Sequence, residues 1–145
     1  KKYLSDFAKA GADFLTVHVE ACGRTLPAVA RSIRLLGVCP GVAINPETPF
    51  SRVAPYLEHF DLLLIMSVHP GFGGQSFISA VLPKLRQANR WIAHHRPHMI
   101  LSVDGGIDDR TAEQARGAGA TLLVAGSSIF GSGNYSRAIR RLRGS

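Results

Sequence analysis

Short, almost uninterrupted apolar segments alternate with segments of helical pattern along the whole sequence. The apolar segments are rich in Val, Ile and Leu, as strands of a parallel sheet covered on both faces must be. The expected strands are Phe14–Val19, Gly41–Ile44, Leu62–Val68, Ile100–Asp104 and Leu122–Gly126. The expected helices are Lys2–Ala10, Leu26–Leu36, Arg52–Glu58, Ser79–His95, Thr111–Gly117 and Asn134–Leu142. This order predicts repeated βα units.

Repeated βα units with right-handed crossovers build either an open doubly wound sheet or a (β/α)8 barrel. A dinucleotide-binding sheet would carry its glycine fingerprint after the first strand, and no such motif follows Val19. Glycine-rich loops follow the later strands instead, which favours the barrel. A complete barrel has eight strands in typically about 250 residues, whereas this chain has 145 residues. We therefore predict a single α/β domain over residues 1–145 that forms the later part of a TIM barrel, with about five parallel strands.

Residues that begin and end helices agree with these boundaries. Either Asp108 or Asp109 is expected to cap the helix that contains Thr111, and either Asn134 or Tyr135-Ser136 is expected to open the last helix. Gly11, Gly37 and Gly119 stand where helices should end.

The composition is that of a folded protein, with 46% hydrophobic and 19% charged residues. No apolar run approaches the ~20 residues that span a membrane. The first residues lack the apolar segment of a signal peptide and an initiator Met, so we expect the chain not to be a complete gene product. Cys22 and Cys39 are too few and too irregularly spaced for a disulfide framework or a zinc site. We expect reduced thiols in a cytoplasmic protein that contacts no membrane.

The net charge of +7 allows two interpretations. It is compatible with nucleic-acid binding, but no basic-aromatic motif accompanies it, so we expect no nucleic-acid partner. It is also compatible with attraction of an anionic small molecule. The densest basic cluster is Arg137, Arg140, Arg141 and Arg143, whose spacing is typical of a solvated helix face.

Three loops on consecutive expected strands have residues suited to an anion. Gly71-Phe72-Gly73-Gly74 exposes backbone N–H groups that could form a phosphate nest, or is a tight turn that needs positive φ. Gly105-Gly106 follows the next strand directly after Asp104. Gly126-Ser127 ends the last strand with N–H and hydroxyl donors, where barrels commonly bind phosphate. Because active sites of barrels lie at the carboxyl ends of the strands, we expect these loops to converge on one phosphate group.

Asp104 ends a buried strand and is followed by Gly105 and Gly106. This carboxylate is a candidate general acid/base or metal ligand beside the phosphate site, with a helix-capping Asp in a glycine turn as the alternative. Met66 lies near the end of the preceding strand, where a core-filling role is the commoner one.

The histidines are weaker candidates. His18 and Glu20 share a strand face and could ligate a metal, but a buried His bonded by its neighbour is favoured. His69 precedes Pro70 and is expected to face solvent.

Five motifs together resemble the ribulose-phosphate 3-epimerase family in order and spacing. They are VHVE (Val17–Glu20), GVAINPETP (Gly41–Pro49), MSVHPGFGGQ (Met66–Gln75), VDGGI (Val103–Ile107) and AGSSI (Ala125–Ile129). The resemblance runs the length of the chain, from about the family's third helix onward. It implies a TIM barrel of the ribulose-phosphate-binding type that interconverts D-ribulose 5-phosphate and D-xylulose 5-phosphate.

The resemblance also implies roles for individual residues. Asp104 corresponds to a carboxylate that binds one divalent metal ion (Zn²⁺, Mn²⁺, Fe²⁺ or Co²⁺) and exchanges a proton with C3 of the substrate. Met66 corresponds to a methionine near the reacting carbons. The residues that correspond to the phosphate site are Gly71, Phe72, Gly73, Gly74, Gly105, Gly106, Gly126 and Ser127.

Inversion at C3 needs an acid/base on each face of the carbon. The family's second Asp, its metal-binding histidines and a substrate-contacting Ser lie on its first three strands, which have no counterpart here. We therefore expect this chain alone to be inactive or nearly so while keeping most of the phosphate site. A six-carbon substrate such as allulose 6-phosphate, and a non-catalytic sugar-phosphate-binding half-barrel, are the alternatives. Exposed sheet edges would favour self-association, and the oligomeric state is left open between monomer and homo-oligomer.

Overall fold

Five parallel strands form one sheet in the order β1-β2-β3-β4-β5, in a computed structural model that describes residues 3–71 and 74–145. The strands are β1 (Phe14–His18), β2 (Cys39–Ile44), β3 (Leu62–Met66), β4 (Ile100–Asp104) and β5 (Leu122–Val124). Each strand pairs in parallel with the next one along the chain. Sequential parallel pairing with a crossover between neighbours is the arrangement of a barrel wall rather than of a doubly wound sheet, whose strand order reverses.

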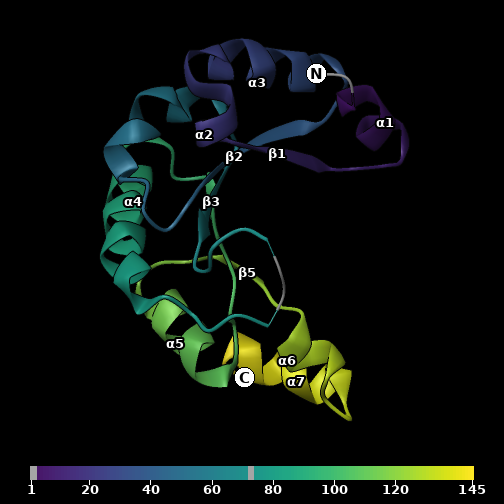
Figure 1. Cartoon of the computed structure of the whole chain (residues 1–145), viewed down its shortest axis with the longest axis vertical. Coiled ribbons are helices and arrows are strands. Elements are labelled where there is room, and N and C mark those ends of the chain that lie inside the picture. The colour runs from purple at the N-terminus through teal and green to yellow at the C-terminus, as the bar shows by residue number, and fades with distance from the viewer. Residues whose placement is uncertain (1–2, 72–73) are drawn as a thin grey trace.

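Helical segments provide the crossovers between the strands. The α-helices are α1 (Leu4–Lys9), α2 (Val19–Cys22), α3 (Leu26–Leu35), α4 (Leu82–His95), α5 (Asp109–Gly117), α6 (Ser127–Phe130) and α7 (Tyr135–Arg143). The 3₁₀ segments are η1 (Gly23–Thr25), η2 (Phe50–Arg52), η3 (Ala54–His59) and η4 (Ser79–Val81). In Figure 1, α3, α4 and α5 follow one another in an arc along one face of the sheet, and the opposite side of the arc is open.

All five strands lie where they were predicted, and most errors lie at the ends of elements. Residues 52–58 form 3₁₀ turns rather than an α-helix, and Pro55, which lacks an N–H donor, lies in the first turn of η3. β3 stops two residues before the predicted end at Val68. The backbone of Ser67 bonds to Asp104 on one side and to the N–H of Ile78 on the other, so the chain turns there.

The predicted helix boundaries are confirmed at several caps. Asp108, not Asp109, caps α5, because its side chain accepts a hydrogen bond from the N–H of Thr111 in a capping box. Asn134 caps α7 through the N–H of Arg137. Gly11, Gly37 and Gly119 all have positive φ and follow α1, α3 and α5.

The main core lies between the sheet and the arc of helices. Leu63 and Ile65 of β3 pack there with Leu85 of α4 and Ala112 of α5, all fully buried. Apolar side chains on the two outer strands are less buried, since Phe14 of β1 is 39% exposed and Leu122 of β5 is 42% exposed. The sequence-based expectation that every strand is covered on both faces is therefore wrong for β1 and β5, whose outer edges have no strand partner among the described residues.

Candidate functional site

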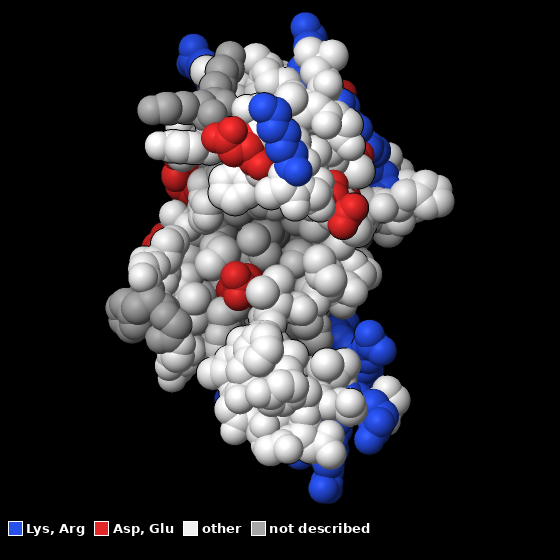
Figure 2. Space-filling view, turned by 90° about the vertical axis from the view of Figure 1, so that its right-hand side faces the viewer, with Lys and Arg blue, Asp and Glu red and all other residues white. Residues whose placement is uncertain are grey.

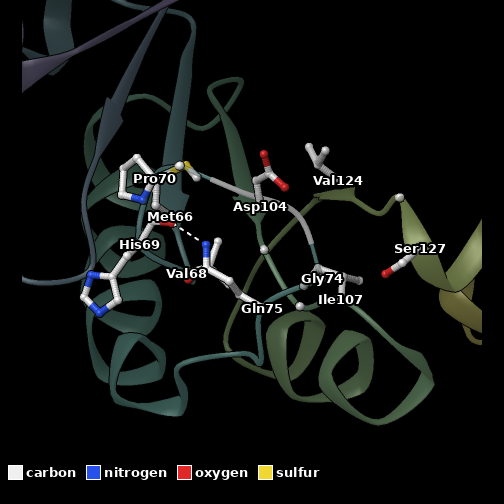
Figure 3. Close-up of a pocket in the computed structure, with 14 residues that line it drawn as sticks. Met66, Val68, His69, Pro70, Gly74, Gln75, Asp104, Ile107, Val124 and Ser127 are labelled. Carbon is white, nitrogen blue, oxygen red and sulfur yellow. Dashed lines mark hydrogen bonds between the residues drawn. The ribbon is translucent and has the colours of Figure 1, made fainter.

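A cavity of about 400 Å³ lies at the carboxyl ends of β3, β4 and β5. It is formed where three consecutive strands deliver their following loops to the same edge of the sheet, as parallel strands do. Its described lining residues are Met66, Val68, His69, Pro70, Gly71, Gly74, Gln75, Asp104, Gly105, Gly106, Ile107, Val124, Gly126 and Ser127. Figure 3 shows these side chains around the opening, with Asp104 between Met66 and Val124.

Asp104 is the acidic side chain of this lining. It ends β4 and is the register partner of Met66 on β3 and of Val124 on β5. Burial raises the pKa of its carboxyl group above the usual value, because desolvation disfavours the charged form. No described residue donates a hydrogen bond to that carboxylate. A partly desolvated and unpaired carboxylate at the floor of a cavity is suited to exchanging protons with a bound molecule.

The two glycines after Asp104 are required by their surroundings. Gly105 has φ +122°, and a Cβ there would lie 2.4 Å from a methyl carbon of Val68. Gly106 has φ +63°, and a Cβ there would lie 2.3 Å from the backbone nitrogen of Phe77. Both the left-handed φ and the close contact exclude any side chain at either position. The backbone of this turn therefore borders the cavity directly.

The first glycine loop borders the cavity through Gly71 and Gly74, whereas Phe72 and Gly73 lie outside the described residues. Gly71 and Gly74 have φ of +148° and +76°, which confirms a turn that needs positive φ. The Nε2 atom of Gln75 donates a hydrogen bond of 2.7 Å to the carbonyl of His69. This bond joins the residue that follows the glycine loop to a residue that precedes it.

The third loop brings Gly126 and Ser127 to the cavity at the start of α6. A Cβ at Gly126 would meet no heavy atom within 4 Å, so this glycine faces open space. All three glycine loops therefore meet at one cavity, as their positions in the sequence predict.

The cavity is not basic. None of its described lining residues is Lys or Arg, although the chain has a net charge of +7. Figure 2 faces the open side of the arc and shows Lys and Arg gathered toward the two ends of the molecule, with a mostly uncharged hollow between them. An anion in this cavity would be bound by backbone N–H and hydroxyl groups, as in the glycine nests of other phosphate sites.

His18 and Glu20 lie away from this cavity. The His18 side chain is 36% exposed, so the expectation of a buried His is wrong, although its Nδ1 lies 3.3 Å from Glu20 Oε2 as expected. Glu20 accepts hydrogen bonds from the N–H of Asn45 and the hydroxyl of Thr48. Burial alone would raise the pKa of Glu20, but these hydrogen bonds outweigh it and lower the pKa.

His69 is at the rim. Its side chain is 63% exposed, as predicted, and pairs with Glu47 through a contact of 2.7 Å. Its ring points away from Asp104 in Figure 3. Cys22 and Cys39 are both free. No helix in residues 3–71 and 74–145 is long and apolar enough to cross a membrane.

Sequence reasoning did not identify several residues of the site. Val68, Gln75, Ile107 and Val124 line the cavity; the first three lie within the quoted motifs, but no role was assigned to any of the four. Two buried hydroxyl residues, Ser67 and Thr111, were also missed as contacts of the turn after Asp104. Ser67 has one sequence signal, a polar residue directly after an apolar run, whereas Thr111 lies in the polar first turn of the predicted helix.

The fold and cavity define a parallel α/β chain of the TIM-barrel type with its site at the carboxyl ends of the strands. A solved structure of 3-hexulose-6-phosphate synthase has this fold, with a TM-score of 0.69 at 21% identity over 99% of this chain and 66% of that one. Residues 1–130 match the model of the ribulose-phosphate 3 epimerase family, and the chain belongs to this family.

Curated relatives agree with this assignment. Ribulose-phosphate 3-epimerase of Bacillus subtilis is 44% identical over 99% of this chain, and that of Synechocystis is 45% identical over 100% of it. The chain spans 66% and 64% of the lengths of these two relatives. The resemblance stated from the motifs is thus confirmed.

Proposed function

We propose that this chain binds the phosphate group of a phosphorylated ketopentose and supplies one acid/base of a ribulose-phosphate 3-epimerase. One observation carries the proposal: Asp104 lies in the same cavity as the three glycine loops. The names of the relatives support the substrate pair D-ribulose 5-phosphate and D-xylulose 5-phosphate.

The chemistry assigned to the site is proton transfer at C3. The ionised carboxylate of Asp104 would take the C3 proton while the C–H electron pair moves toward the C2 carbonyl oxygen. Met66, the register partner of Asp104, would give this carbon an apolar neighbour. Epimerisation then requires proton return on the opposite face. In the described lining His69 is the other titratable group, and its ring points away from Asp104.

The family resemblance implies a divalent metal ion as cofactor. The residues described here do not form a site for it, because residues 3–71 and 74–145 contain no group of three or more His, Cys, Asp or Glu side chains placed to hold a metal. Asp104 offers one carboxylate ligand, which is too few for stable coordination on its own. We therefore derive no step that involves a metal ion.

The direct test is ligand binding followed by isotope exchange. Adding D-ribulose 5-phosphate to the ¹⁵N-labelled chain should shift the amide signals of Gly105, Gly106 and Gly126, with a dissociation constant of roughly 1 mM. Incubation in D₂O then asks whether the C3 proton is replaced by deuterium. Unchanged amide signals at saturating sugar phosphate would overturn the proposed phosphate site.

The same experiment separates the alternatives. Allulose 6-phosphate tests the six-carbon substrate, and a clear preference for it would replace the pentose assignment. Binding of the pentose phosphate without any exchange at C3 would support the non-catalytic half-barrel.

A further inference from the structure

Three polar side chains are buried in the part of the chain that the structure describes, namely Ser67, Ser102 and Thr111. Two of them contact the turn that follows Asp104. The hydroxyl of Ser67 lies 2.9 Å from the carbonyl oxygen of Asp104 and 2.7 Å from that of Gly105. The hydroxyl of Thr111 lies 2.9 Å from the carbonyl oxygen of Gly106. Three consecutive carbonyl groups therefore lie within hydrogen-bonding distance of buried hydroxyls, and the single hydroxyl proton of Ser67 is shared between the carbonyls of Asp104 and Gly105.

Peptide planarity converts these contacts into an orientation of the neighbouring N–H groups. In a trans peptide the C=O of one residue and the N–H of the next point in opposite directions. Holding the carbonyls of Asp104, Gly105 and Gly106 toward Ser67 and Thr111 therefore turns the N–H groups of residues 105, 106 and 107 the other way. All three of these residues line the cavity.

Outside the strand ladders, no residue within 3–71 and 74–145 accepts a hydrogen bond from the backbone nitrogens of Gly105, Gly106 or Ile107. Ile107 is 4% exposed, and an unbonded donor at such a position costs free energy unless water or a ligand binds it. Consecutive free N–H groups on one side of a turn are the donors of an anion nest.

We infer that Ser67 and Thr111 are positioning residues that hold this turn with its N–H groups directed at the anion before the anion binds. The inference rests on the proposed function for the identity of the anion, a phosphate group. Of the two residues, Ser67 contributes more to holding the turn, because its hydroxyl contacts two of the three carbonyls and its own backbone also bonds to Asp104 and Ile78. It links the end of β3, the end of β4 and the segment that returns from the first glycine loop.

Ser67→Ala removes the donor and leaves the backbone contacts in place. We expect the dissociation constant for inorganic phosphate to rise by about 3- to 10-fold, the equivalent of one net hydrogen bond. Ser67→Thr keeps a hydroxyl and should restore most of the affinity. Ser102→Ala is the matched control, because Ser102 is a buried serine on β4 that makes none of these contacts, and its phosphate affinity should stay within about 2-fold of the parent.

Thr111 needs a separate control because it also takes part in the capping box of α5. Thr111→Val removes the hydroxyl that accepts the N–H of Asp108 and contacts Gly106, while the N–H of Thr111 still donates to Asp108 Oδ1. Asp108→Ala breaks the cap while leaving the hydroxyl of Thr111 free to bind the Gly106 carbonyl. Weaker phosphate binding in Thr111→Val than in Asp108→Ala, at similar losses of stability, supports positioning. Equal phosphate affinities in these two variants would reduce Thr111 to a capping role.

A measurement on the ligand-free chain keeps the two proposals distinguishable. Amide order parameters of Gly105 and Gly106 should be near those of rigid backbone, about 0.85, in the parent chain and should fall in Ser67→Ala. If the parent binds no phosphate but these values fall in the variant, the proposed function fails while the positioning role stands. If neither the order parameters nor the phosphate affinity changes in Ser67→Ala, the positioning role of Ser67 is wrong.

Discussion

Met66 and Asp104 are direct register partners across the parallel pair β3 and β4, and both face the cavity at the carboxyl ends of these strands. Partial burial raises the pKa of Asp104, because desolvation disfavours its ionised form. The same relationship places the proposed proton acceptor beside a side chain that can pack against a sugar carbon.

The raised pKa of Asp104 predicts how stability depends on pH. The folded state holds the carboxyl proton more tightly than the unfolded state, so ionisation of Asp104 destabilises the fold as pH rises above the unfolded value of 3.8 and through the raised folded pKa. Asp104→Asn should therefore have a higher urea midpoint than the parent at pH 7, with the gain shrinking as pH falls toward 3.5. A gain that is equal at both pH values would contradict this assignment.

The same substitution at Gly106 and at Gly126 is expected to affect two different properties, stability at the first and phosphate binding at the second. Gly106→Ala should lower the free energy of unfolding by about 1–3 kcal/mol, because the new Cβ would contact Phe77 at a strained φ. Gly126→Ala should leave stability within about 0.5 kcal/mol, since its Cβ enters open space. That space is the cavity, so Gly126→Ala should instead weaken phosphate binding by roughly 10-fold. Denaturant unfolding and phosphate titration of both variants check this contrast.

Glu20 is predicted to act on stability and not on the site. Its hydrogen bonds with Asn45 and Thr48 connect α2, which follows β1, to the loop after β2. Glu20→Gln should lower the free energy of unfolding by about 1 kcal/mol at pH 7. Because the folded pKa of Glu20 is lowered, its contribution to stability is present above the usual glutamate pKa of 4.5 and is lost as pH falls through the lowered folded pKa.

Glu58 offers the matched control for Glu20. Its side chain is 73% exposed beside His59, so Glu58→Gln makes the same change of charge without breaking a loop contact and should change stability by less than about 0.5 kcal/mol. Equal costs for the two substitutions would mean that the hydrogen bonds of Glu20 contribute nothing.

Element types and the convergence of the glycine loops were predictable because they depend on local periodicity and on the geometry of parallel strands. The end of β3 was not, since it depends on contacts of Ser67 with Asp104 and Ile78 that are distant in sequence. Exposed sheet edges were expected from the missing barrel strands, and the exposure of Phe14 and Leu122 agrees with this, although the apolar content of a strand does not by itself reveal whether its neighbour is present. The role proposed for Ser67 depends on peptide orientation, which no residue pattern encodes.

Metal addition gives a prediction about turnover. Supplying Zn²⁺, Mn²⁺, Fe²⁺ or Co²⁺ to this chain should not produce normal epimerisation, because the described residues offer one metal ligand, Asp104, and one acid/base aimed into the cavity. Conversion of D-ribulose 5-phosphate is measured with each metal, using the Bacillus subtilis relative as the positive control. Turnover comparable to that control would refute the prediction.

The edges of the sheet predict self-association. Phe14 on β1 and Leu122 on β5 are 39% and 42% exposed, and neither strand has a second strand partner among the described residues. Unpaired strand edges with apolar side chains favour pairing with another chain. Light scattering should show a mass that rises with concentration in the micromolar range. Phe14→Lys combined with Leu122→Lys should shift the distribution toward monomer, because charged side chains at strand edges oppose such pairing. A parent chain that stays monomeric across this range would show that these edges do not drive association.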